Sequence, residues 1–441
     1  MAELFEEKHW VGEFFVNDNY EERFVGEVNY SPESGVVLSY SITSHQVPSE
    51  ANIVHGILST GEKCTLVGKF APRQFIPTLK NGLATQHGRI GFSCLVIGDL
   101  LKEEEQFNNI NFSLTGMQEF FFPKGYKDLV KYSDKPLFSI STGYGKIEIG
   151  NNAKFNFLHK DVSSQIYSQN QDAQNKLKQV FEELGHEYPN ANFMLKKDIE
   201  YRIFMNIDIG LDIVSAYKHI NDISNLFSIL IYAPVYPDSI HILKKNEENP
   251  SVTLVVYPSM SLGNRTMELS LKDRSHFNMP ITKKNIDLEE IIKQWLNTSN
   301  DYSTIVSSVQ NETGYRDEHS LHGELVLYST QFESISYDTD QKESKYEYPI
   351  NEYGTTKIKN NVKRIFERAG ESDIGKGIGS LRNEIAHVGR PKKLLKKITM
   401  RDKVYLSQYM QLTILGFILN EIGIKKTVIN EYQDKFISYT E

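Results

Sequence analysis

The sequence is poor in cysteine. Its two cysteines, Cys64 and Cys94, both lie inside strand-like runs, and two buried thiols explain them better than a disulfide or a metal site. None of His9, His45, His55, His87 and His159 is spaced from a Cys, Asp or Glu as the ligands of a metal site are. The sequence therefore excludes a disulfide scaffold, and we expect neither a metal nor another cofactor.

Long apolar runs are also missing, since no uninterrupted stretch is long enough to cross a bilayer. The first residues lack a basic region followed by an apolar run, so no secretory signal is expected. The balance of 39% hydrophobic and 24% charged residues is that of a globular protein. We therefore expect a folded cytoplasmic protein, and a chain of 441 residues predicts two or three domains.

Charge is distributed unevenly along the chain. The net charge of -8 argues against nucleic-acid binding by the chain as a whole. Residues 354–403, however, hold 14 Lys or Arg against 5 Asp or Glu, a local charge of +9 that leaves -17 for the remainder. An anionic partner is expected at this basic segment.

The first 120 residues alternate apolar and polar positions as β-strands do. The predicted strands are Trp10–Val16, Phe24–Tyr30, Val36–Ile42, Asn52–Leu58, Lys63–Phe70 and Ile90–Ile97. A mixed segment follows, with strands at Ile110–Leu114, Lys146–Phe157, Glu200–Ile209, Ser239–Leu243 and Val252–Tyr257 and helices at Gln171–Leu184 and Asp212–Ile231. The pattern is typical of an antiparallel sheet, of which a sandwich is one form.

From about residue 285 the apolar period becomes helical. Helices are expected at Leu288–Leu296, Leu321–Ile335, Val362–Ala369, a fourth capped by Ser372, and a buried fifth at Val404–Ile422. The polar stretch Ser336–Tyr348 is interpreted as a solvated loop. The predicted fold is α+β, with a β-rich antiparallel region at 1–275, divisible at 190/191, and an all-α helical bundle at 280–441.

A polar and basic stretch, residues 380–393, stands near the end of the fourth predicted helix. It carries Arg382, Asn383 and His387 and is followed by Gly389 and Pro391, which stop a helix. At about 100° per residue, the core stripe is Ile374, Ile378, Leu381 and Ile385. Asn383 and His387 are then expected together on the opposite face, with Arg382 beside them.

Small residues form a row between these two faces, at Gly375, Gly379 and Ala386. Interior glycines each cost a helix roughly 1 kcal/mol relative to Ala, so close approach of another helix is expected here. A phosphate-binding loop at Gly375–Gly379 is a weaker interpretation, because no strand precedes it.

Arg, Asn and His together can cleave RNA without a metal. His titrates near neutrality and can take the 2′-OH proton, while Arg offers phosphate a fixed fork of donors. Asn383 could orient His387 or the phosphate, and the products would be a 2′,3′-cyclic phosphate and a 5′-OH. Contacts to the RNA backbone are expected from Arg390, Lys392, Lys393, Lys396 and Lys397, with Arg401 and Lys403 continuing the run.

Other interpretations of this stretch stay open. A solvated polar face with an incidental His would need no function, and the neighbouring cations make it the weaker choice. Glu384 could join the site or pair with a nearby cation.

The stretch Arg382–His387 resembles the signature of the HEPN superfamily of helical nucleases, an Arg and a His separated by four to six residues. That resemblance implies catalytic Arg382 and His387, a supporting Asn383, and a metal-independent site composed by a homodimer. A second loose match, Arg316 to His322, lacks the Asn and is interpreted as surface or packing.

The N-terminal region is similar to that of the ApeA group of anti-phage HEPN proteins. The similarity is carried by Trp10–Phe14, Phe24–Tyr30, His55–Leu58, Thr65–Gly68 and Ile223–Leu230. It implies an abortive-infection endoribonuclease, with tRNA as candidate substrate and a phage-derived trigger acting at the N-terminal region. The alternatives are a catalytically silent HEPN module that binds a nucleotide or a protein, and a structural adaptor.

Overall fold

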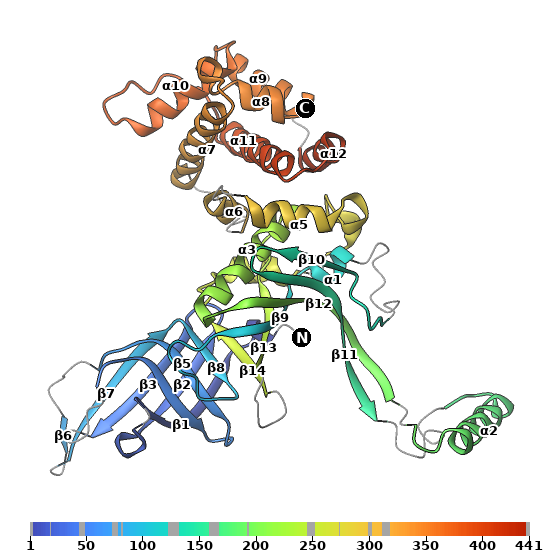
Figure 1. Ribbon diagram of the computed structural model, residues 1–441. Coiled ribbons are helices and arrows are strands. Elements are labelled where there is room, and N and C mark those ends of the chain that lie inside the picture. Colours follow the sequence, from blue (N-terminus) through green and yellow to red (C-terminus); the bar gives the residue numbers. More distant parts are fainter. Residues whose placement is uncertain are drawn as a thin grey trace.

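A computed structural model describes residues 3–17, 19–43, 49–72, 78–80, 83–121, 132–157, 167–191, 194–244, 252–272, 274–298, 302–310 and 318–437. A β-rich N-terminal region is followed by a helical C-terminal region, and the two lie at opposite ends of the molecule (Figure 1). This arrangement confirms the predicted α+β class. Among the described residues, no helix combines the length and apolar character needed to span a membrane.

The strands of the described residues form one antiparallel sheet. They are β1 (Lys8–Phe15), β2 (Phe24–Ser31), β3 (Gly35–Thr43), β4 (Ala51–Leu58), β5 (Lys63–Phe70), β6 (Thr78–Lys80), β7 (Leu83–Phe92), β8 (Cys94–Ile97), β9 (Phe107–Leu114), β10 (Phe138–Thr142), β11 (Gly145–Phe157), β12 (Met194–Leu211), β13 (Pro237–Lys244) and β14 (Val252–Pro258). Their order is β10-β11-β12-β9-β13-β14-β8-β5-β4-β1-β2-β3-β7-β6. The strands thus belong to one continuous sheet, not to the two separate sheets of a sandwich.

The predicted strand Ile90–Ile97 is divided in the structure. Ser93 separates β7, which pairs with β3, from β8, which pairs with β5. The Ser93 amide donates to the carbonyl of Val67 in β5 at 2.8 Å. One stretch of chain therefore joins strands that lie far apart in the sheet order, and the N-terminal strands curl around their shared core.

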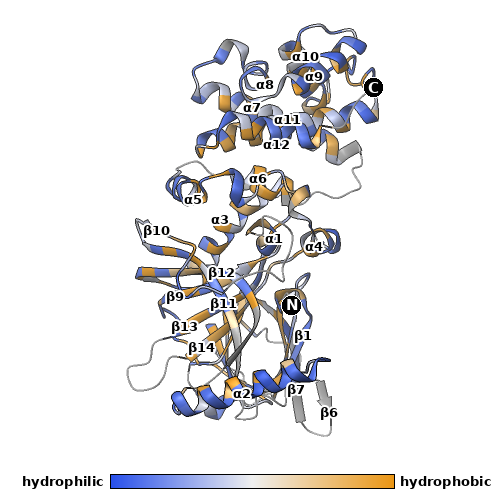
Figure 2. Ribbon diagram, turned by 90° about the vertical axis from the view of Figure 1, so that its right-hand side faces the viewer, coloured by the Kyte–Doolittle hydropathy of each residue, from blue (hydrophilic) through white to orange (hydrophobic). Residues whose placement is uncertain are grey.

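Alternating burial gives that core its apolar face. Along β2 every second residue is buried, starting at Phe24, and the residues between are exposed. The period-2 pattern of the sequence is what places these side chains on one face of the sheet. Figure 2 colours the apolar and polar residues of the strands, and β14 is largely hydrophobic.

A long two-stranded ribbon of β11 and β12 projects from the body and carries helix α2 (Gln171–Glu187) (Figure 1). Asn170 caps α2 by accepting from the amides of Asp172 and Ala173. No residue of α2 is buried, and the helix is mostly hydrophilic (Figure 2).

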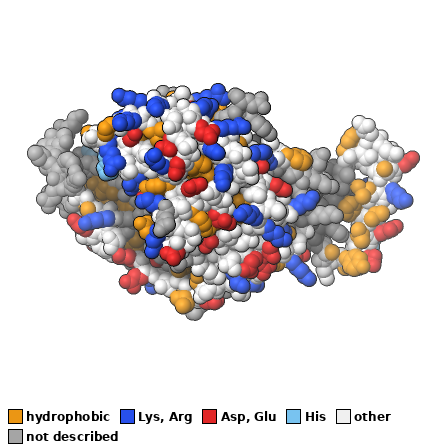
Figure 3. Space-filling model, turned by 90° about the horizontal axis from the view of Figure 1, so that it is seen from above, with side chains coloured by type: hydrophobic (Ala, Val, Ile, Leu, Met, Phe, Trp, Pro, Cys, Tyr) orange, Lys and Arg blue, Asp and Glu red, His pale blue; other side chains and the backbone are white. Residues whose placement is uncertain are grey.

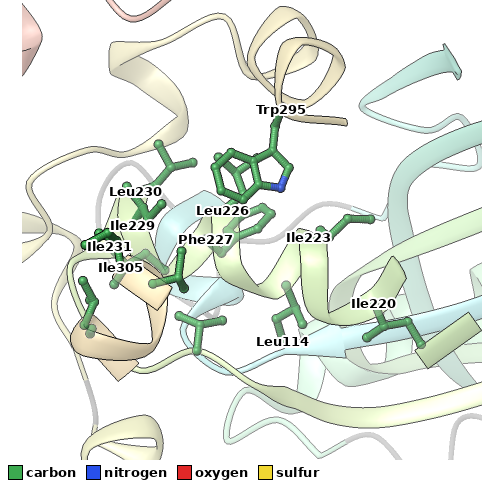
Figure 4. Close-up of a cluster of buried hydrophobic side chains, with 14 of the residues drawn as sticks. Leu114, Ile220, Ile223, Leu226, Phe227, Ile229, Leu230, Ile231, Trp295 and Ile305 are labelled. Atoms are coloured by element: carbon green, nitrogen blue, oxygen red, sulfur yellow. The ribbon is translucent and has the colours of Figure 1, made fainter. Parts of the chain in front are cut away.

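Helix α3 (Ile213–Ile231) is the apolar centre between the sheet and the helices. Asp212 caps its start, and the helix buries residues on most sides, including Ile223, Leu226 and Phe227 (Figure 4). Trp295 of α5 (Leu288–Asn297) donates from Nε1 to the carbonyl of Asp222 at 2.8 Å. α5 is therefore fixed on α3.

The remaining helices differ in length, from five residues in α1 to 22 in α11. They are α1 (Met117–Phe121), α4 (Asn264–Leu271), α6 (Ser303–Gln310), α7 (Glu318–Asp338), α8 (Tyr348–Tyr353), α9 (Thr356–Arg368), α10 (Ile374–Ala386), α11 (Met400–Glu421) and α12 (Lys426–Phe436). Short 3-10 turns lie at Glu3–Phe5, Tyr20–Glu22, His276–Asn278, Lys283–Asn285 and Lys342–Ser344. As predicted for Val404–Ile422, α11 is buried along most of its length, and it contacts α7, α8, α9 and α12.

Side-chain hydrogen bonds tie the helical region to α3. Tyr232, which ends α3 with a positive φ of 55°, donates from its hydroxyl to Gln411 Oε1 of α11 at 2.8 Å. Tyr432 of α12 donates to the carbonyl of Ile229 at 2.8 Å. α3 thus contacts both the sheet and the C-terminal helices.

Candidate functional site

Helix α10 carries the Arg and Asn of the sequence motif, and the His follows it as the C-cap. Its N-cap is Asp373, which accepts from the Lys376 amide at 2.8 Å, and not Ser372 as predicted. Ile374, Ile378 and Leu381 are buried, as the core stripe requires. The apolar side of α10 is therefore buried as predicted, although the N-cap is one residue after the predicted Ser372.

His387 does not continue the helix. α10 ends at Ala386, and His387 is the C-cap, with extended backbone at φ -114° and ψ 113°. Its amide still donates to the Asn383 carbonyl at 3.2 Å, as in a helix, and its side chain is exposed. His387 thus lies one hydrogen-bonded turn after Asn383 as the cap of the helix, and the shared face of the two side chains stays a prediction.

Arg382 is held loosely. Its Nη1 lies 3.5 Å from Asn383 Oδ1, and its Nη2 lies 3.7 Å from Glu333 Oε2 of α7. The Nε atom is buried and has no hydrogen-bond partner in the structure. The side chain as a whole is 29% exposed.

Glu333 is held firmly by two other groups. Its Oε1 accepts from Lys345 Nζ at 2.6 Å and from the Tyr346 hydroxyl at 2.5 Å. Burial opposes ionisation of this carboxyl, but the hydrogen bonds from Lys345 and Tyr346 and the charges of Lys345 and Arg382 outweigh it and lower the pKa of Glu333. Glu333 is therefore a fixed anion beside Arg382.

The glycines of α10 accommodate aromatic rings of the same chain. A Cβ at position 379 would lie 2.9 Å from Cε2 of Tyr346, and one at position 377 would lie 2.7 Å from Cδ1 of Phe366 in α9. The close approach predicted at the glycine row is therefore real. At Gly379, however, the approaching group is the ring of Tyr346, which precedes α8, and not a second helix.

Glu384 anchors the loop that follows α10. It is 8% exposed, and its two carboxylate oxygens accept from the amides of Leu394 at 3.0 Å and Leu395 at 2.8 Å. Lys392 donates to the carbonyls of Glu384 and His387, the latter at 2.8 Å. The carboxylate of Glu384 thus binds backbone amides, a role that is neither of the two alternatives left open by the sequence.

The predicted RNA-binding cations lie in and after this loop. Arg390, Lys393, Lys396 and Lys397 are exposed, whereas the ammonium of Lys392 is engaged by the two carbonyls. Lys403 is only 5% exposed and so does not extend the run. On the face seen in Figure 3, Lys and Arg side chains lie among Asp and Glu.

The second loose match, Arg316 to His322, is only half described. Arg316 lies outside the described residues, and His322 is in α7. Among the residues that the structure covers, no group of three or more His, Cys, Asp or Glu is placed to hold a metal ion. Cys64 and Cys94 are free and buried, and burial raises the pKa of each thiol to about 12.

Sequence reasoning did not single out Glu333, Lys345 or Tyr346. Glu333 falls inside the predicted helix Leu321–Ile335, and the other two fall in the stretch interpreted as a solvated loop. The three tyrosines of that polar stretch, Tyr337, Tyr346 and Tyr348, were the available signal. Contact between α7, this turn and α10 is a property of the fold.

A family model described as ApeA N-terminal domain 1 matches residues 9–295, from β1 into α5. This match covers well over half of the chain, so the chain belongs to the ApeA family. Its N-terminal domain is that of an anti-phage defence protein. A search of curated proteins and a search of solved structures found no significant match.

Proposed function

We propose that the helical C-terminal region is a HEPN ribonuclease domain, and that the chain is a metal-independent endoribonuclease of anti-phage defence. The observation that carries this proposal is the end of α10, where Arg382 is loosely paired and His387 is exposed. The family supports the defence role, and the motif residues support the chemistry.

In the proposed reaction His387 takes the proton of a ribose 2′-OH, which then attacks the adjacent phosphorus. Arg382 stabilises the charge that develops on the phosphate oxygens, because its guanidinium presents two donors at fixed spacing. Asn383 lies next to Arg382 and orients its Nη1 edge. The bond between phosphorus and the 5′-oxygen then breaks, and the proton held by His387 passes to the leaving 5′-oxygen through solvent. The products are a 2′,3′-cyclic phosphate and a 5′-OH end.

RNA is the proposed substrate, with tRNA as the candidate class. Four exposed cations follow His387 in the chain, namely Arg390, Lys393, Lys396 and Lys397. Contacts of this kind to the RNA backbone give affinity without sequence choice. The ApeA domain is the proposed place at which a phage-derived trigger acts.

The proposed site is completed by a second copy of the chain. Within the described residues, the His387 side chain makes no hydrogen bond or ion pair, although its backbone makes several. A two-fold contact at the exposed end of α10 would bring two Arg382–His387 sets together.

Cleavage by the purified protein tests this proposal. We expect wild type to cleave RNA in EDTA as well as without it, and His387→Ala and Arg382→Ala to lose cleavage while keeping the wild-type melting temperature. His186→Ala, which changes an exposed histidine of α2, is the control and should cleave normally. Full cleavage by His387→Ala, or loss of wild-type cleavage in EDTA, would contradict the mechanism.

A further inference from the structure

Glu333 lies between two cations that come from different parts of the helical region. Lys345 follows α7 after a turn, and Arg382 lies on α10. The Glu333 side chain is 17% exposed, so all three charges meet in a partly desolvated position. Charges in such a position interact more strongly than at an open surface.

The two oxygens of Glu333 are used unequally. Oε1 receives hydrogen bonds at 2.6 Å and 2.5 Å from Lys345 and Tyr346, which fix the carboxylate. Oε2 faces Arg382 Nη2 at 3.7 Å, which is an ion-pair distance and too long for a hydrogen bond. The carboxylate therefore attracts the guanidinium without saturating its donors.

Tyr346 sets the position of this carboxylate relative to α10. Its hydroxyl donates to Glu333, and its ring lies against Gly379, about one turn before Arg382. One side chain thus touches both the carboxylate and the helix that carries the arginine. The position of Glu333 relative to α10 is therefore fixed by packing as well as by charge.

We infer that Glu333 is a positioning residue for Arg382, an assignment that rests on the ribonuclease function proposed above. Attraction by Oε2 holds one edge of the guanidinium towards α7 and leaves the other edge for a phosphate. A phosphate can bind the guanidinium through short hydrogen bonds, because the ion pair with Glu333 at 3.7 Å leaves the donors of Arg382 unsaturated. Glu333 orders Arg382 before RNA binds, and this lowers the entropic cost of reaching the reactive geometry.

Steady-state cleavage by Glu333→Gln tests the assignment. The amide keeps the size of the side chain but loses its charge, so we expect kcat to fall by on the order of 10- to 100-fold, with KM for RNA within about twofold of wild type. Asp338→Asn removes an exposed carboxylate from the same helix and should leave both constants unchanged. The melting temperature of each variant is measured in parallel.

A second variant covers the case in which Glu333→Gln does not fold. Tyr346→Phe removes one of the two hydrogen bonds to Oε1 and keeps the ring against Gly379. We expect a smaller decrease in kcat, again with little change in KM. Glu333→Asp, which restores the charge on a shorter side chain, should recover part of the activity lost in Glu333→Gln.

Several results would overturn the assignment. Cleavage by folded Glu333→Gln equal to that of Asp338→Asn would show that Arg382 needs no such partner. Higher activity would show that Glu333 restrains Arg382. A rise in KM at constant kcat would place Glu333 in RNA binding. Failure of the ribonuclease proposal is distinguishable, because wild type itself would then show no cleavage.

Discussion

Glu384 stands inside the sequence motif, between Asn383 and Ile385, yet its side chain serves the loop after α10. Both carboxylate oxygens accept backbone amides, from Leu394 and Leu395. Helical periodicity could not show this, because the partners come from a loop whose path depends on the Gly389–Pro391 stop. The motif therefore contains an exposed His387 and a buried Glu384 that holds the following loop in place.

Truncation of Glu384 should destabilise the protein. Glu384→Ala leaves two amides without acceptors, and we expect the free energy of unfolding to fall by about 1–3 kcal/mol. Urea denaturation measures the change, with Glu367→Ala as control because Glu367 is exposed on α9. Equal stability of the two variants would mean that Glu384 does not anchor the loop.

Arg382 illustrates the limit of sequence reasoning at this scale. Its position on α10 and its neighbour Asn383 followed from the sequence, whereas its contact with Glu333 did not. A salt bridge between two helices depends on how their axes cross, and apolar periodicity fixes only which face of each helix is buried.

Among the elements, α10 shows where pattern and structure agree. Its buried stripe follows the apolar period of the sequence. The helices α7, α9 and α11 lie where their own apolar periods predicted helices. The ends are different, since Asp373 caps the helix and His387 leaves it. Capping is decided by one or two side chains and by the following loop, so it is less predictable than the period.

The glycines of α10 provide a test of its packing. Ala at position 379 would meet the Tyr346 ring at 2.9 Å, whereas Ala at 375 would meet its nearest atoms at 3.4 Å. Helix propensity favours both substitutions equally, but only Ala at position 379 would have to displace a ring. We therefore expect the free energy of unfolding of Gly379→Ala to be lower than that of Gly375→Ala by about 1–3 kcal/mol. Urea unfolding of the two variants measures this difference. Equal midpoints would show that the Tyr346 ring moves aside without cost.

For the molecule as a whole, the sequence predicted a β-rich region followed by helices but not the order of the strands. β7 and β8 are consecutive in the chain and pair with β3 and β5, a connection that alternating polarity cannot specify. α3 connects the sheet to α11 and α12 through Tyr232 and Tyr432. The ApeA domain and the helical region are therefore in direct contact through α3.

Self-association is a further property of the whole molecule that the proposed site predicts. If the site needs two copies, the active protein should sediment as a homodimer, and specific activity should fall on dilution below the dimer dissociation constant. Analytical ultracentrifugation at the assay concentration measures the mass. A monomeric mass together with full cleavage activity would contradict the shared site.

The central claim is that Arg382 and His387 cleave RNA. Its most direct test is to express wild type and His387→Ala in a bacterial host and to sequence RNA ends that bear a 5′-OH. The account predicts new 5′-OH ends, with 2′,3′-cyclic phosphates on the matching upstream fragments, in cells with wild type alone. The same ends in cells with His387→Ala, or none above background in cells with active wild-type protein, would contradict it.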